Sequence, residues 1–239
     1  TWTSPRIGSL LGAKNTPIDH RHFAKAASAD RRALWRARVE LKRVLGDKAR
    51  ARIERAFVSR NDSPVLLRRV LDGLDENALW IGFARRFAPY KRAGLLYKNI
   101  ARLRKICEST DRPVRILVAG KAHPRDQLGK DILRGIAEIA RNDDLAGRVI
   151  VLENYDIELA RALVQGVDVW LNTPTRMLEA SGTSGMKVAC NGGLNLSIAD
   201  GWWPEAADGR NGWTIGNLAR SYQQQDLQDA ERRPDHETI

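Results

Sequence analysis

The run Leu79-Trp80-Ile81-Gly82-Phe83 is the first of five short apolar segments that decide the fold of this chain. The other four are Val114–Ala119, Val149–Leu152, Val167–Leu171 and Leu194–Ile198. Amphipathic segments of helix length separate them, at Tyr90–Ile106, Asp126–Arg141, Ile157–Val164 and Ser184–Asn191. Strands that alternate with helices predict a parallel sheet covered by helices, with right-handed crossovers. The sequence therefore predicts an α/β protein.

The chain before this alternation reads as helical. Ser4-Pro5 predicts a helix start and Gly12 its end, and a second helix is expected from Ala29 until Gly46 stops it. A further helix would contain Ile53 and Phe57, and another would run from Ser63-Pro64 to Gly73. We expect residues 1–73 to form a helical connector with little core of its own. Residues 74–222 would form the α/β domain, and residues 223–239 a polar tail.

Composition bounds the partners of this chain of 239 residues, whose net charge is +11. No eighteen consecutive apolar residues occur, so we expect no membrane span. Much of the basic excess lies between Arg31 and Arg60, but Glu40, Asp47 and Glu54 interrupt it and no aromatic series accompanies it. The pattern is typical of solvated helices, and we expect no nucleic-acid partner.

Cysteine and histidine spacing argues against disulfides and metals. Cys107 and Cys190 are far apart in apolar surroundings, which suits reduced thiols of a cytoplasmic protein. His20 and His22 have no Cys or third His nearby, which favours a surface pair over a metal site.

Polar residues follow each of the first four predicted strands, at the end where parallel sheets bind ligands. They are Arg85-Arg86 with Tyr90-Lys91-Arg92, Gly120-Lys121-Ala122-His123, Glu153-Asn154-Tyr155, and Asn172-Thr173. Arg85, Arg86 and Lys91 place three cations beside a helix expected to begin near Tyr90, which indicates a phosphate site. Any one of them alone could be a surface charge at a strand end.

The stretch Glu179-Ala180-Ser181-Gly182-Thr183-Ser184-Gly185-Met186-Lys187 combines a carboxylate, hydroxyls, glycines and one amine. Glycines let backbone N–H groups approach an anion, and a lone amine can attach an aldehyde cofactor. The alternative is a strand-to-helix turn built from small residues.

These nine residues resemble the pyridoxal-phosphate lysine segment of the glycogen, starch and maltodextrin phosphorylases, E-A-S-G-T-x-x-M-K. Residues 84–93, A-R-R-F-A-P-Y-K-R-A, resemble the family's V-K-R-I-H-E-Y-K-R-Q, and residues 152–155 match its L-E-N-Y. The resemblance spans Leu79 to Gly216 and includes Asn191-Gly192 and Asp200-Gly201.

The resemblance implies a role for each matched residue. Arg85 and Arg86 would hold the substrate phosphate and, with Lys91, take part in catalysis. Glu179, Ser181 and Gly182 would bind the hydroxyls of the reacting glucose. The pyridoxal 5′-phosphate site would comprise Tyr90, Lys91, Tyr155, Thr183, Ser184, Gly185 and Lys187, of which Lys187 carries the cofactor.

The resemblance also implies a fold and an activity. The family has two Rossmann-like domains (the GT-B glycosyltransferase fold), and this chain resembles the second, preceded by the helical connector. The implied reaction is phosphorolysis of α-1,4-glucan by inorganic phosphate to glucose 1-phosphate, with retention. We expect the chain to be a fragment whose partner is the missing N-terminal domain, and to be inactive alone. A second copy of the chain is a further candidate partner.

Several positions depart from the larger animal and plant enzymes and resemble the compact prokaryotic branch. Arg85 replaces Lys, Asp156 replaces Arg, Gly185 replaces Asn, and Gly201-Trp202-Trp203-Pro204-Glu205 replaces G-A-N-V-E. Trp202 and Trp203 could stack on sugars or serve packing. Two other functions stay open: a nucleotide-sugar glycosyltransferase such as a glycogen synthase, which commonly places Glu where Lys187 stands, and a binding remnant without catalysis.

Overall fold

A parallel six-stranded sheet forms the centre of the computed structural model, which describes residues 2–13, 18–142 and 144–216. Its strands are β1 (Leu79–Arg86), β2 (Val114–Lys121), β3 (Val149–Leu152), β4 (Val169–Asn172), β5 (Leu194–Ile198) and β6 (Gly212–Ile215). Their order is β3-β2-β1-β4-β5-β6, and every neighbouring pair is parallel. The predicted α/β fold is confirmed, while β6 is a strand that the sequence did not predict.

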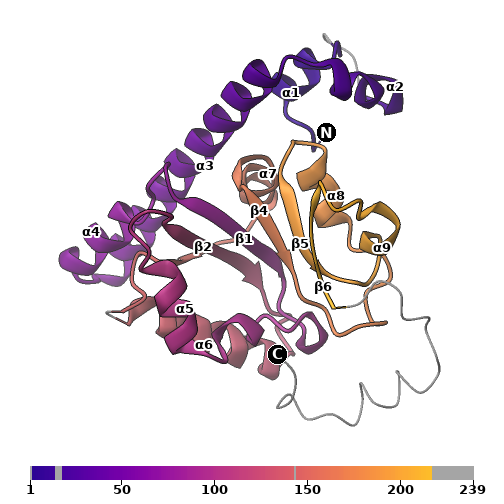
Figure 1. Cartoon of the computed structure of the whole chain (residues 1–239). Coiled ribbons are helices and arrows are strands. Elements are labelled where there is room, and N and C mark those ends of the chain that lie inside the picture. Colours follow the sequence, from indigo (N-terminus) through magenta and orange to yellow (C-terminus); the bar gives the residue numbers. More distant parts are fainter. Residues whose placement is uncertain (1, 14–17, 143, 217–239) are drawn as a thin grey trace.

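Helices cover both faces of this sheet (Figure 1). The α-helices are α1 (Pro5–Leu10), α2 (His20–Phe23), α3 (Arg31–Arg60), α4 (Pro64–Asp72), α5 (Ile100–Cys107), α6 (Gln127–Arg141), α7 (Ile157–Gly166), α8 (Thr183–Ala189) and α9 (Trp203–Ala206). Short 3₁₀ turns are η1 (Ala24–Ser28), η2 (Pro89–Lys91) and η3 (Leu95–Tyr97). One apolar core joins α3, α4, α7 and α8 to the sheet, and a second core joins α5 and α6 to the other face.

The predicted break at Gly46 is wrong, because α3 continues through it to Arg60. A Cβ at Gly46 would lie 3.2 Å from the Trp80 indole, so the missing side chain serves close packing on the sheet. Gly166 at the end of α7 has the same function, since a Cβ there would lie 2.6 Å from Leu45 Cβ. Both glycines therefore let α3 pack tightly against α7 and the sheet.

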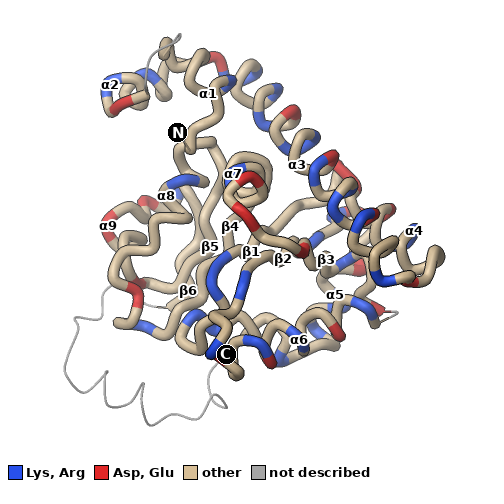
Figure 2. The backbone as a smooth tube through the Cα atoms, turned by 180° about the vertical axis from the view of Figure 1, so that it is seen from behind, with Lys and Arg blue, Asp and Glu red and all other residues tan. Residues whose placement is uncertain are grey.

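Basic residues are spread along α3 with acidic residues among them (Figure 2). Several form ion pairs, such as Lys48 with Glu158 on the neighbouring α7 and Arg52 with Asp156, which caps that helix. No helix within residues 2–13, 18–142 and 144–216 has the length and hydropathy that a membrane span requires.

The helix predicted for Tyr90–Ile106 is also wrong over its first half. Arg92 adopts a left-handed conformation (φ 48°), and a regular helix begins only at Ile100, where Asn99 caps it. The intervening segment is held against the chain beyond β4, since Tyr90 O accepts from Thr175 N at 2.6 Å and the Arg92 guanidinium donates to the Thr173 carbonyl. The helix N-terminus expected near Tyr90 is therefore at Ile100 instead.

The order of the strands reverses between β1 and β4. From β1 the chain adds β2 and β3 on one side, and it then returns to place β4, β5 and β6 on the other. In open parallel sheets the carboxyl ends of strands at such a reversal form the crevice where ligands bind. The division at residues 73 and 74 stays a prediction, and residues 217–239, with the whole predicted tail, lie outside the described part of the chain.

Candidate functional site

Arg85 and Arg86 end β1 and point to opposite faces of the sheet, as neighbouring residues of a strand do. The Arg85 side chain is only 8% exposed, and its guanidinium lies 5.1 Å from the centre of the Phe83 ring. Burial lowers the pKa of Arg85, while the nearby Glu179 carboxylate opposes that change. Within the described residues Arg85 Nε has no hydrogen-bond acceptor. The buried cation thus keeps unused donor capacity.

Lys91 brings a second cation to the same place. Its ammonium forms an ion pair with Glu179 Oε2 and lies 4.7 Å from the centre of the Tyr90 ring. Arg85 Nη1 lies 3.7 Å from the same carboxylate oxygen. We call Arg85, Lys91 and Glu179 the rim cluster. Its three side chains are at most 12% exposed, and two positive charges share one negative charge.

Two tyrosines border the rim cluster. The phenols of Tyr90 and Tyr155 lie close enough to Arg85 to affect its pKa. Burial raises the pKa of Tyr155, and Arg85 opposes this. Asp156, next in the chain, accepts from Leu159 N at 2.8 Å as the cap of α7 and from Arg52 Nη2 at 2.7 Å. The carboxylate that departs from the larger enzymes therefore has a local structural function.

The glycine-rich motif forms the turn into α8. Gly182 is left-handed (φ 76°) and caps α8 without a side chain, and a Cβ there would lie 3.3 Å from the Glu179 carboxyl carbon. Thr183 is exposed at the start of the helix. Ser184 Oγ accepts from Trp170 Nε1 at 3.1 Å, and a Cβ on Gly185 would lie 2.5 Å from Asn195 Oδ1. Ser184 and Gly185 thus help to pack α8 onto the sheet.

Lys187 lies on α8 and is half-buried. Its ammonium is 3.8 Å from the centre of the Trp2 ring. Asn191 holds Trp2 there, since its Nδ2 donates to the carbonyls of Trp2 (3.1 Å) and Lys187 (2.7 Å). Sequence reasoning missed this contact because nothing local to Trp2 indicates that it packs on a distant helix.

Two further predicted site residues, Arg86 and Ser181, are not part of the rim cluster. Arg86 is exposed and aligned in register with Lys121 on β2, which is also exposed. Ser181 O accepts from Trp202 N at 2.9 Å, so its backbone is fixed. The structure brings Arg85, Lys91 and Glu179 together with Tyr90 and Tyr155. Arg86 stands apart on the strand end.

The two adjacent tryptophans differ in environment. Trp203 is fully buried and donates from Nε1 to Thr214 Oγ1 at 2.8 Å, so it serves packing. Trp202 packs edge-on against it, with ring centres 5.6 Å apart, and is half-buried.

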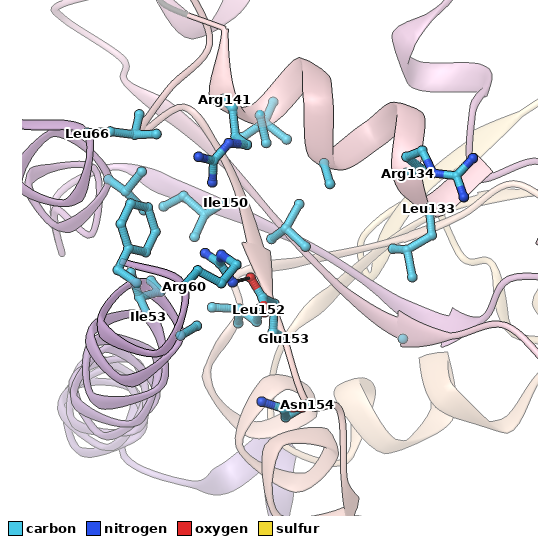
Figure 3. A pocket seen from close by; sticks show the side chains of 18 of the residues that line it. Ile53, Arg60, Leu66, Leu133, Arg134, Arg141, Ile150, Leu152, Glu153 and Asn154 are labelled. Carbon is cyan, nitrogen blue, oxygen red and sulfur yellow. Dashed lines mark hydrogen bonds and ion pairs between the residues drawn. The ribbon is translucent and has the colours of Figure 1, made fainter. Parts of the chain in front are cut away.

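A separate pocket lies at the free edge of β3, between α3, α4 and α6 (Figure 3). Its volume is about 610 Å³, and most of its wall is aliphatic. We call it the edge pocket. Its two guanidinium groups near Phe57 are already bound: Arg60 pairs with Asp62 and Glu153, and Arg141 pairs with Asp62. None of the residues with a predicted phosphate, cofactor or sugar role lines it, although Gly120, Glu153 and Asn154 from the predicted strand ends do.

Among the described residues no group of three or more His, Cys, Asp or Glu side chains is arranged to hold a metal ion. The acids near the rim cluster instead contact cations or backbone amides.

Comparison with known proteins identifies the family. The family model described as carbohydrate phosphorylase matches residues 66–212, which include β1 to β5 and the whole rim cluster. This chain belongs to the carbohydrate phosphorylase family. The predicted resemblance is confirmed at the level of the family.

Named relatives of this phosphorylase family member are prokaryotic and animal. The maltodextrin phosphorylase of Thermococcus litoralis is 50% identical over 184 residues, which cover 77% of this chain and 22% of the relative. The glycogen phosphorylase of Mycobacterium tuberculosis is 40% identical over 218 residues, covering 90% of this chain and 25% of the relative. The liver glycogen phosphorylase of Homo sapiens is 34% identical over 102 residues, covering 40% of this chain and 12% of the relative. The chain thus spans about a quarter of the length of the prokaryotic relatives.

Proposed function

We propose that this chain is the cofactor-bearing part of an α-glucan phosphorylase, which converts α-1,4-glucan and inorganic phosphate to glucose 1-phosphate with retention. The observation that carries the proposal is the rim cluster, where two buried cations share one carboxylate at the reversal of strand order. A buried excess of positive charge is stabilised by an anion. The names of the relatives support phosphate and glucan as the substrates.

The residues present fit pyridoxal 5′-phosphate. Lys187 offers an amine that faces an indole ring rather than an acid, and Gly182 opens the start of α8 to an anion without a side-chain cap. The site around Lys187 would be completed by Thr183, Ser184, Gly185, Tyr90, Lys91 and Tyr155. When bound, the cofactor supplies a phosphate group that exchanges a proton with the substrate phosphate.

The protein's own residues would hold and orient the reactants. Arg85 and Lys91 would bind anionic oxygens, and Arg86 would reach the substrate phosphate from the end of β1. Each phosphate carries about −1.5 to −2 charge at neutral pH, so two phosphates match several cations. Glu179, with the backbone of Ser181 and Gly182, would accept hydrogen bonds from the glucose hydroxyls and orient the sugar for attack on one face.

The cofactor assignment is tested on this chain by labelling. Incubation with pyridoxal 5′-phosphate, reduction with borohydride and peptide mapping should place the label on Lys187. Lys187→Arg should remove the label, and Lys105→Arg, an exposed lysine of α5, should leave it unchanged. Label on Lys91 or Lys121 instead would contradict the assignment.

Two other functions make different predictions. A nucleotide-sugar glycosyltransferase would transfer glucose from a sugar nucleotide without phosphate, and Lys187 argues against it because such enzymes commonly carry Glu there. A binding remnant would take up cofactor, yet an enzyme of full family length built around it would release no glucose 1-phosphate from maltodextrin and phosphate. The same assay on full-length protein separates all three.

We further propose that the 239-residue chain alone has no phosphorylase activity. Its strand ends supply one wall of a site, and a glycosyl cation without an opposing wall is open to water. The partner would be the N-terminal domain of the same protein, in the cytoplasm. Sustained release of glucose 1-phosphate by the purified chain with cofactor would contradict this.

A further inference from the structure

Asp200, two residues beyond the end of β5, is a buried carboxylate that the proposed reaction does not use. It is 4% exposed, and both of its oxygens accept backbone hydrogen bonds. Oδ2 accepts from Glu179 N at 3.0 Å, and Oδ1 accepts from Gly201 N at 2.9 Å. Burial of a carboxylate is costly unless its oxygens are satisfied, so these two N–H groups fix where Asp200 lies. Asp200 in turn fixes the backbone of Glu179.

The turn that contains Asp200 also forms a backbone hydrogen bond with the glycine-rich motif that follows Glu179. Trp202 N donates to Ser181 O at 2.9 Å, so the two segments bond in both directions. Gly201 has a positive φ of 59°, and a Cβ there would lie 2.4 Å from Ser181 O. Only glycine lets the two backbones approach this closely. The contact is therefore a built feature of the turn.

The Glu179 side chain depends on this anchor. Its carboxylate forms an ion pair with Lys91 and lies 3.7 Å from Arg85, and all three side chains are largely buried. In a buried site a charged pair is strongly sensitive to small displacements, because little water screens it. If the amide of Glu179 moved, its carboxylate would no longer meet both cations.

We propose that Asp200 is a positioning residue that sets the Glu179 carboxylate against Lys91 and Arg85. The effect on ligand binding rests on the proposed function: by fixing Glu179, Asp200 would determine how the site presents that carboxylate to the sugar hydroxyls. In this function Asp200 acts only as a double acceptor of backbone hydrogen bonds. A carboxylate is required because an amide would turn its NH₂ group toward one of the two N–H donors.

The test compares Asp200→Asn with Asp208→Asn in this chain. Asp208 is a matched control, because its Oδ1 also accepts two backbone bonds, from Arg210 N at 2.9 Å and Asn211 N at 3.0 Å, in a different turn. The readout is the rate at which an amine-acylating reagent modifies Lys91, followed by mass spectrometry. We expect Asp200→Asn to raise this rate about tenfold, since a hydrogen bond to a charged group typically contributes a tenfold factor or more. Asp208→Asn should leave it unchanged.

The acylation rate of Lys42, measured in the same spectra, reports whether the variant is destabilised as a whole. It is buried on α3, where it donates to Asp168 Oδ2 at 2.6 Å. Glu179→Gln gives the reference rate for Lys91 without its partner. An unchanged Lys91 rate in Asp200→Asn overturns the proposal, and so does an equal rise at Lys42, which would make Asp200 a general structural residue.

The outcome for Asp200 is separable from the proposed function. If Lys91 becomes reactive in Asp200→Asn while the chain takes up no cofactor at Lys187, the positioning of Glu179 stands and the phosphorylase assignment fails. If cofactor labels Lys187 but Lys91 stays protected, the reverse holds. In an enzyme of full family length, Asp200→Asn should raise KM for glucan more than KM for phosphate.

Discussion

The rim cluster and the edge pocket both contain arginines and acids, but their charge balance differs. In the edge pocket two guanidinium groups meet two carboxylates, and these side chains are partly exposed. In the rim cluster two cations meet one carboxylate, and the three side chains are only 8–12% exposed. The pocket has the clearer hollow, yet its Arg60 and Arg141 guanidinium groups are already paired with carboxylates. The comparison teaches that unmatched buried charge, more than volume, marks the site for an anion.

The largest effect is expected on turnover, from Arg86 at the strand end next to Arg85 of the rim cluster. In an enzyme of full family length, Arg86→Ala should lower turnover by about 10²–10³, the usual effect of losing a preorganised donor to a reacting anion. Arg134→Ala, at the edge pocket, is the control and should change little, because its side chain is 64% exposed. The measurement is kcat and KM with phosphate and with maltodextrin varied separately.

If turnover and KM for phosphate were both unchanged in the Arg86→Ala enzyme, Arg86 would have no role in binding the substrate phosphate. The exposed position of Arg86 beside Lys121 would then be that of two ordinary surface cations.

A stability measurement tests the charge balance directly. Glu179→Gln leaves Arg85 and Lys91 buried without their acid, and breaking such a pair typically costs about 3–5 kcal/mol. Glu153→Gln at the edge pocket removes an exposed partner of Arg60, where an ion pair contributes about 0–1 kcal/mol. Urea unfolding of the chain gives both free energies.

Added inorganic phosphate should sharpen this contrast. It should restore part of the stability of Glu179→Gln, because an anion that binds only the folded state stabilises it. Glu153→Gln should show no larger phosphate effect than the unaltered chain. Equal losses in the two variants, with no phosphate dependence in either, would mean that the rim cluster is not an anion site.

Local pattern predicted much of the fold. Five strands were found from their apolar runs, because strands buried on both faces leave a strong signal. β6 was missed, since Gly212–Ile215 is only partly buried and carries a weaker pattern. Gly46 was misread as a helix stop because sequence shows the missing side chain but not the Trp80 ring that takes its place.

The site was harder to predict. The sequence analysis named each residue of the rim cluster, Arg85, Lys91 and Glu179. Their mutual pairing, however, depends on the loop after β1, where the left-handed conformation of Arg92 replaces the expected helix. Trp2 and Asp200 were not assigned to the site, because each acts through a contact far along the chain. Such contacts depend on tertiary packing, which no periodicity encodes.

The smallest expected effect is the pH dependence of the edge pocket. Hydrogen bonds and charge from Arg141, with Arg60, lower the pKa of Asp62 from 3.8 to about 2 in the folded chain. A carboxyl whose pKa is lower when folded stabilises the fold above its unfolded pKa, and this contribution is lost as the pH falls toward the folded pKa. The stability advantage of the unaltered chain over Asp62→Asn should therefore be full above about pH 5 and shrink between about pH 4 and pH 2. Urea midpoints of the two proteins at several pH values measure it, with Asp111→Asn, an exposed loop change, as control. A constant difference across that range would mean that Asp62 is not paired with its arginines in solution. The edge pocket would then no longer be an example of arginines whose charge is matched by acids, and its contrast with the rim cluster would fail.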